Sequence, residues 1–227
     1  MWAQAPNAAA AAKPAAPKAP TEVPKLANGK PDFSGVWDIG YVPDMERAAG
    51  IKLPFTPAGK KDWDEYDDAK FDYTGHCLPA GLTRQMNTPM PMEIVQNNTK
   101  IAFLWEGFSN FLSVPTDGRP PRKIDPTWAG ESVGHWEGDT LVIETTNFNE
   151  KTRLDTRGHP HSTQLHVTQK FSRPKPDQIA YEVIIDDPAY YTEKWTNKRT
   201  FQLKPDWELM EYSCMENNLD LTEGHLK

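Results

Sequence analysis

The stretch that decides the fold covers residues 132–148 and reads S-V-G-H-W-E-G-D-T-L-V-I-E-T-T-N-F. Two runs rich in β-branched and aromatic residues, 132–137 and 140–148, flank the pair Gly138-Asp139. Such a pair between two strand-like runs is typical of a β-hairpin turn. The stretch therefore predicts two antiparallel strands.

The same pattern recurs on both sides of this hairpin. Short apolar or alternating runs, separated by turn residues, predict further strands at 33–40, 92–96, 100–106, 110–114, 165–172, 179–186, 192–203 and 208–214. Consecutive hairpin-linked strands usually close into a barrel, because closure removes the exposed edges of the sheet. We expect an all-β fold, an antiparallel up-and-down barrel of about nine or ten strands, in preference to a sandwich.

The rest of the chain divides into a leader, one helix and a long loop. Residues 1–30 are rich in Ala and Pro and predict a disordered leader, so that one barrel domain covers 31–227. Thr56 followed by Pro57 is a helix-start signal and predicts one helix over 56–70. Residues 71–91 contain Gly, Pro and Asn breaks, and we expect a long loop there.

Composition and the first residues of the chain limit the expected binding partners and the expected cellular compartment. The net charge of −7 argues against nucleic acid, which needs clustered Lys and Arg, and without a run of about 18 apolar residues we expect no membrane span. The start M-W-A-Q-A-P resembles the end of a secretory signal, which predicts a periplasmic or secreted protein. In that setting Cys77 and Cys214 would form a disulfide; the alternative is two buried thiols in a cytosolic protein.

Several segments resemble a family of largely uncharacterised exported bacterial β-rich proteins. They read P-D-F-S-G-V-W at 31–37, L-P-F-T-P-A-G at 53–59, C-L-P-A-G-L-T-R at 77–84, D-P-T-W-A-G-E-S-V-G-H-W-E-G-D-T-L-V-I-E-T at 125–145, G-H-P-H-S-T-Q-L-H-V at 158–167, I-D-D-P-A-Y-Y-T at 185–192 and C-M-E-N-N-L-D at 214–220. They span about 190 of the 227 residues. The family brings no established activity, and where it often has an acidic residue after H-P-H-S, this chain has Thr163. The Gly35-x-Trp37 unit is also similar, more weakly, to lipocalin and calycin barrels.

The segment 153–166, R-L-D-T-R-G-H-P-H-S-T-Q-L-H, holds three of the six histidines and should be a loop and strand entrance rather than a buried run. A histidine exchanges protons near neutral pH, an aspartate orients it and an arginine binds an anion. We expect His159 or His161 to act as general base or acid, Asp155 to orient it and Arg153 to hold an anionic part of the substrate. The predicted function is a cofactor-independent lyase, isomerase or cyclase.

Other interpretations of the same loop stay open. His159, His161 and His166 could hold a metal ion, although the Glu that follows H-x-H in cupin sites is missing here. The charged residues could also form loop salt bridges without any chemistry. A lipocalin-like carrier without catalysis is a third alternative.

A ligand pocket is predicted from aromatic and polar strand residues. Alternation places Asn197 and Arg199 on the same face as Trp195 and Phe201, a mixed face that fits either a ligand-lined barrel or a cross-strand salt bridge. The candidate substrate-binding residues are His135, Trp136, Tyr190, Trp195, Trp105 and Arg199. We find no dinucleotide, phosphate-loop or nucleophile-elbow motif, so the expected partner is a small molecule, with no cofactor. The oligomeric state is not indicated.

Overall fold

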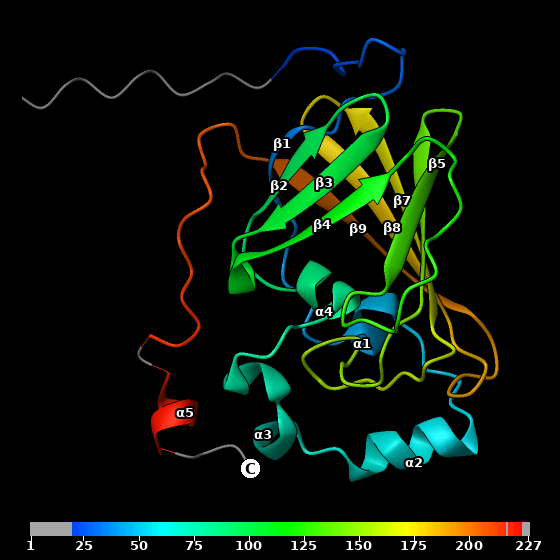
Figure 1. Cartoon of the computed structure of the whole chain (residues 1–227), viewed down its shortest axis with the longest axis vertical. Helices are drawn as coiled ribbons and strands as arrows, with labels where there is room; N and C mark the ends of the chain where they lie inside the picture. Colours follow the sequence, from blue (N-terminus) through cyan, green and yellow to red (C-terminus); the bar gives the residue numbers. More distant parts are fainter. Residues whose placement is uncertain (1–19, 217, 224–227) are drawn as a thin grey trace, which may run out of the picture.

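The computed structural model describes residues 20–216 and 218–223 and contains one nine-stranded antiparallel sheet (Figure 1). Its strands are β1 (Gly35–Asp38), β2 (Met92–Gln96), β3 (Lys100–Trp105), β4 (Asn110–Pro115), β5 (Glu131–Glu137), β6 (Thr140–Thr146), β7 (His166–Lys175), β8 (Gln178–Asp186) and β9 (Trp195–Leu203). Of the predicted leader, residues 1–19 lie outside the described part.

The sheet is an up-and-down, nearly closed barrel, as the hairpin pattern predicted. Strand β1 pairs with both β2 and β9, so the first and last strands join, and the remaining seam lies between β4 and β5. The architecture is consistent with a calycin-like barrel. The predicted strand at 208–214 is wrong: both edges of β9 are already paired, with β8 and β1, and residues 208–214 form an irregular segment.

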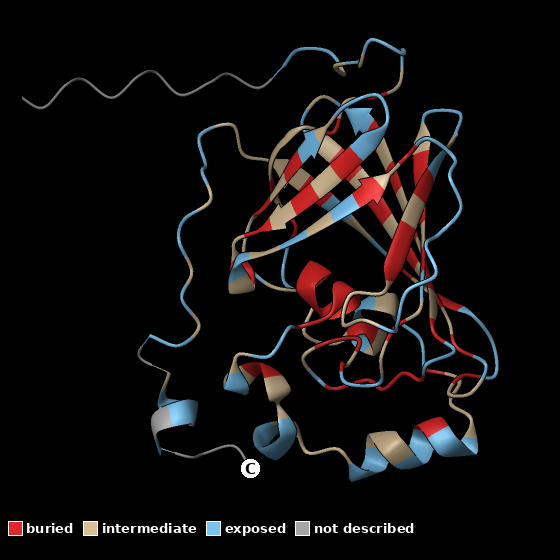
Figure 2. Ribbon diagram, viewed as in Figure 1, coloured by how far each residue is buried: buried red, intermediate tan, exposed pale blue. Residues whose placement is uncertain are grey.

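The interior of the barrel is filled by large side chains. Trp37, Phe103, Phe171, Tyr181 and Phe201 are each at most 2% exposed and belong to one core cluster. Figure 2 shows the buried positions of the strands as red bands. Alternation along each strand brings them inward, as the sequence predicted.

Short helices gather at one end of the barrel (Figure 1). They are α1 (Met45–Ala49), α2 (Pro57–Glu65), α3 (Asp68–Phe71), η1 (Tyr73–His76), α4 (Leu82–Met86), η2 (Gly107–Ser109) and, on the C-terminal segment, α5 (Leu219–Glu223). The expectation of one helix was therefore too low.

The predicted helix start is confirmed, because the Thr56 hydroxyl accepts the Gly59 N–H and Pro57 begins α2. The helix ends earlier than predicted, where Tyr66 turns to an extended backbone. The expected loop at 71–91 instead contains α4, all of whose residues are buried.

Helices α4 and α1 explain the polar residues on the inner face of β9, where Asn197 donates to the Met45 carbonyl of α1 at 3.2 Å. The Arg199 guanidinium donates to the Asn87 side chain and to the Met86 carbonyl at the end of α4, at 2.8 and 2.5 Å. It also lies over the Tyr181 ring, 5.2 Å from its centre. Through Arg199, the mixed face of β9 therefore joins the barrel wall to its end plug.

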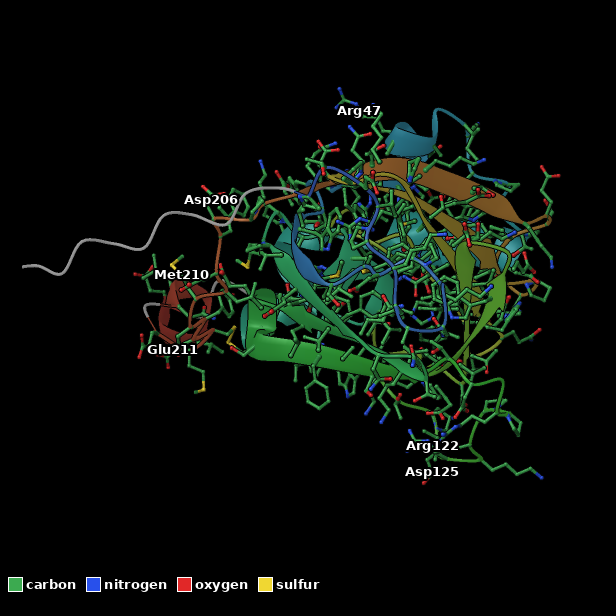
Figure 3. The ribbon with its side chains drawn as sticks, turned by 90° about the horizontal axis from the view of Figure 1, so that it is seen from above. Arg47, Arg122, Asp125, Asp206, Met210 and Glu211 are labelled. Atoms are coloured by element: carbon green, nitrogen blue, oxygen red, sulfur yellow. A yellow bond between two sulfur atoms is a disulfide. The ribbon has the colours of Figure 1, made fainter. Side chains whose placement is uncertain are left out.

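The C-terminal segment is fastened by the predicted disulfide between Cys77 and Cys214, whose Cα atoms are 5.7 Å apart. Figure 3 shows Met210 and Glu211 on this segment at one side of the barrel, while Arg122 and Asp125 lie on the loop that leads to β5. The disulfide suggests an exported protein. The helices in the described residues are all too short or too polar to cross a lipid bilayer.

Candidate functional site

The predicted cluster lies in the loop that joins β6 to β7, at the end of the barrel where the helices gather. The loop position was predicted, but its burial was not. Asp155 and His159 are fully buried, and His161 is 4% exposed, whereas Arg153 and Arg157 reach toward the helices below. The loop is thus a packed layer beneath the barrel.

Asp155 and His159 form a hydrogen-bonded pair. The His159 Nδ1 atom lies 2.6 Å from the Asp155 carboxylate, which also accepts the Met45 N–H at 2.6 Å and the Gly158 and His159 N–H groups. Since the carboxylate accepts this hydrogen bond, Nδ1 carries the proton. Asp155 therefore fixes the tautomer and orientation of the ring, while its part in catalysis stays a prediction.

One face of the His159 ring is covered as well. The Trp63 indole stacks on this face, with ring centres 4.3 Å apart and planes within 9° of parallel. Its Nε2 atom lies 3.5 Å from the Glu46 carboxylate and has no hydrogen-bond partner in the described part of the chain. Burial opposes charging of this ring, but the hydrogen bond to Asp155 and the charges of Asp155, Asp44 and Glu46 outweigh it and raise the pKa of His159.

His161 occupies a separate position. Its Nδ1 donates to the Ser162 carbonyl at 3.1 Å, and its Nε2 accepts from the Thr152 hydroxyl at 2.6 Å. Burial lowers the pKa of His161, so the ring is neutral near pH 7. Both nitrogens are engaged, and the ring fastens the two ends of the loop.

The three histidines proposed as metal ligands do not meet. His166 lies on the outer face of β7 and contacts Glu144. The group of potential ligands that the described residues do bring together is Asp44, Asp155 and His159, whose ligand atoms lie within 4.8 Å of one another.

Arg153 lines a cleft below the loop. Its guanidinium donates to Asp62 on α2 at 2.6 Å and lies over the Tyr66 ring, 4.4 Å from its centre. The cleft has a volume of about 370 Å³. Its walls come from α2, α3, η1 and the loop, and are made by Asp62, Glu65, Tyr66, Phe71, Tyr73, Glu150, Lys151 and Arg153.

Two phenols of this region are protonated near neutral pH. Burial and the nearby Asp72 charge raise the pKa of Tyr66 to about 12. Burial and contact with Asp62 also raise the pKa of Tyr190, which follows β8. Tyr190 thus shares the partner Asp62 with Arg153.

The other predicted pocket residues are distributed differently. Trp105 and Trp195 are core residues, and Trp136 stacks on Phe33. His135 is exposed on the outer face of β5, 3.4 Å from Glu137. The structure does not bring these residues to one open pocket.

The cleft residues of α2 and η1 were not predicted as site residues. Asp62 lies in a strongly charged helix and Tyr66 directly follows it, and such a composition more often marks a solvent-facing surface. The useful signal was the aromatic pair Trp63 and Tyr66, spaced three residues apart in this polar helix. Those two rings cover His159 and Gly158.

No family model matches the chain, and no curated protein matches it significantly. The functional conclusion therefore depends on the residues of the cleft and of the loop above it.

Proposed function

We propose that the protein is an exported, cofactor-independent acid/base enzyme that acts on a small, partly hydrophobic molecule with an anionic group. The observation that carries the proposal is the cleft lined by Arg153, Tyr66 and Tyr73 at the helical end of the barrel. A concave site with aromatic walls and a few fixed charges is the usual form of a small-molecule site.

Arg153 is the proposed anchor for the anionic group. In the described part of the chain its side chain donates one hydrogen bond, to Asp62, so further N–H donors remain for a ligand. The Tyr66 ring and the Asp62 carboxylate hold the guanidinium in place, which reduces the entropy lost on binding. This is the role that the sequence predicted for Arg153.

Asp62 is the proposed proton acceptor, and Tyr190 is a proposed hydrogen-bond donor to the substrate. The Asp62 carboxylate is partly exposed and would accept a proton from the substrate, while the Arg153 and Tyr190 donors stabilise the oxyanion that forms. Return of the proton to another atom gives isomerisation, and departure of a leaving group gives elimination.

The catalytic roles of His159 and His161 stay predictions from the sequence. Direct proton transfer by His159 would have to use Nε2, because Nδ1 is bonded to Asp155, and Nε2 is buried 3.5 Å from the Glu46 carboxylate. In the arrangement described, both histidines hold the loop that carries Arg153.

Binding and proton exchange test the proposal together. A panel of small aromatic carboxylic acids and their neutral amides is titrated into the wild type, Arg153→Ala and the control Arg157→Ala, whose guanidinium pairs with exposed Asp68. A charge-assisted hydrogen bond contributes about 1.5–3 kcal/mol, so we expect Arg153→Ala to weaken acid binding by about tenfold or more and the control to leave it unchanged. If the wild type bound acids no more tightly than amides, and Arg153→Ala bound the acids as tightly as the wild type, the proposal would be contradicted.

Deuterium incorporation from D2O, followed by proton NMR, reports acid/base chemistry on any bound acid. We expect exchange in the wild type and its loss in Asp62→Asn. Tight binding without exchange or product would favour a carrier instead, and the filled barrel interior would then place the carried ligand in the cleft.

A further inference from the structure

The cleft presents a second cation beside Arg153. Lys151 also lines it, and because the two residues are two positions apart in the chain, their Cα atoms are at most about 7 Å apart. The Lys151 N–H donates to the Asn149 side chain at 3.0 Å, which holds this part of the loop in place. One short stretch of chain therefore brings two positive charges to the same cleft.

The Lys151 ammonium lies over the indole of Trp128, 5.8 Å from the ring centre. Trp128 in turn lies beside Tyr73 of the cleft wall, with ring centres 6.3 Å apart. The preceding residue, Thr127, exchanges backbone hydrogen bonds of 3.1 and 2.8 Å with the segment 147–149, just before Lys151. Trp128 is thus held at the edge of the cleft and extends its aromatic wall beyond Tyr73.

The Lys151 ammonium is not neutralised by the protein. Lys151 is exposed, and within the described residues no carboxylate forms an ion pair with it. A cation–π contact leaves the three N–H donors of a lysine free for a ligand. The three carboxylates that line the cleft act on other groups: Asp62 on Arg153, Glu65 on Lys61 and Glu150 on Tyr190.

We propose that Lys151 and Trp128 form a second anion subsite of the cleft, so that the substrate is a partly hydrophobic molecule with two anionic groups. One group would lie on the Arg153 guanidinium and the other on the Lys151 ammonium, with the apolar part against Tyr66 or Tyr73. This inference rests on the function proposed for the cleft and extends it by a second recognised group. Only a dianion makes the additional charge-assisted hydrogen bond, so Lys151 selects dianions over monoanions.

The test compares benzoate with the three isomeric benzenedicarboxylates, which carry the second carboxylate at different distances from the first. Each is titrated by calorimetry into the wild type, Lys151→Met, Trp128→Leu and the control Lys198→Met. Lys198 lies on the barrel wall and pairs with Glu182, so its replacement removes the same charge away from the cleft. Circular dichroism verifies that each variant is folded; because Lys151 is exposed, its variant provides the test if Trp128→Leu does not fold.

We expect at least one dicarboxylate to bind the wild type about tenfold or more tightly than benzoate. Lys151→Met should lose this advantage and bind benzoate as the wild type does, folded Trp128→Leu should lose part of the advantage, and Lys198→Met should keep it. An advantage that is absent from the wild type, or that Lys151→Met keeps, would overturn the second subsite, while benzoate binding that depends on Arg153 would leave the first subsite standing. If none of the acids bound the wild type, both the second subsite and the function proposed for the cleft would be overturned.

Discussion

The Trp63 indole of α2 lies flat on the His159 imidazole, with the ring centres 4.3 Å apart. This contact joins an otherwise polar helix to the most buried part of the loop. The neighbouring residue Asp62 lines the cleft, whereas Trp63 and His159 are not among its lining residues.

Replacing Trp63 with alanine should loosen α2. An aromatic pair contributes about 0.5–1.5 kcal/mol beyond its buried area, and the half-buried indole adds an apolar term, so we expect Trp63→Ala to lose about 1–3 kcal/mol of unfolding free energy. Urea denaturation measures the loss. Trp207→Ala is the control, because Trp207 is 40% exposed. If Trp207→Ala lost as much unfolding free energy as Trp63→Ala, a specific contribution of the Trp63–His159 stack would be contradicted.

The Tyr66 ring, which covers position 158, leaves room there only for a glycine. The φ of Gly158, +88°, disfavours a side chain, and an added Cβ would lie 2.0 Å from the Tyr66 ring. Gly138 in the β5–β6 turn also has a positive φ, +61°, but open space around it. We expect Gly158→Ala to destabilise the fold by about 2 kcal/mol more than Gly138→Ala, since only the first adds a clash to backbone strain. Equal losses in thermal unfolding would show that Tyr66 moves away freely.

The ion pair between Arg84 and Asp72 should make stability depend on pH. Burial opposes ionisation of Asp72, but its hydrogen bond to Arg84, at 2.7 Å, and the charge of that guanidinium lower the pKa of the carboxyl group below its usual 3.8. A lowered folded pKa contributes stability above the unfolded pKa, and this stability is lost as the pH falls through the folded value. We expect Asp72→Asn to be clearly less stable than the wild type at pH 7. The difference should shrink below about pH 4; denaturant midpoints that differ equally at pH 7 and pH 3 would exclude this linkage.

The disulfide should stabilise the C-terminal segment. Cys77 and Cys214 are 137 residues apart, and removal of a native disulfide usually costs about 2–5 kcal/mol. We expect the double variant Cys77→Ser/Cys214→Ser to unfold at lower urea concentration than the oxidised wild type and to be unaffected by dithiothreitol. A wild type whose midpoint does not change on reduction would show that the segment is held by its other contacts.

The barrel could be predicted because its signals are local. Turn pairs such as Gly138-Asp139 and the alternation in β7 and β8 appear directly in the chain. Nine of the ten predicted runs begin or end within a few residues of an observed strand. The run at 208–214 failed for a nonlocal reason, because no free sheet edge remains beside β9.

The site was predictable only in part. Asp155 and His159 are four residues apart, so their pairing follows from the loop itself. The partners of Arg153 could not be foreseen, because Asp62 is 91 residues away and reaches it through the packing of α2 beneath the barrel. Glu46 was equally hidden, since a glutamate in a short polar helix carries no sign that it faces a buried histidine.

A crystallographic screen with small aromatic carboxylic acids tests the central proposal most directly. We predict that an acid occupies the cleft, with its ring against Tyr66 or Tyr73 and its carboxylate on the Arg153 guanidinium, and that soaks of Arg153→Ala crystals leave the cleft without it. Acids that bind only elsewhere, or that occupy the cleft unchanged without the Arg153 side chain, would contradict the assignment of this cleft as the substrate site.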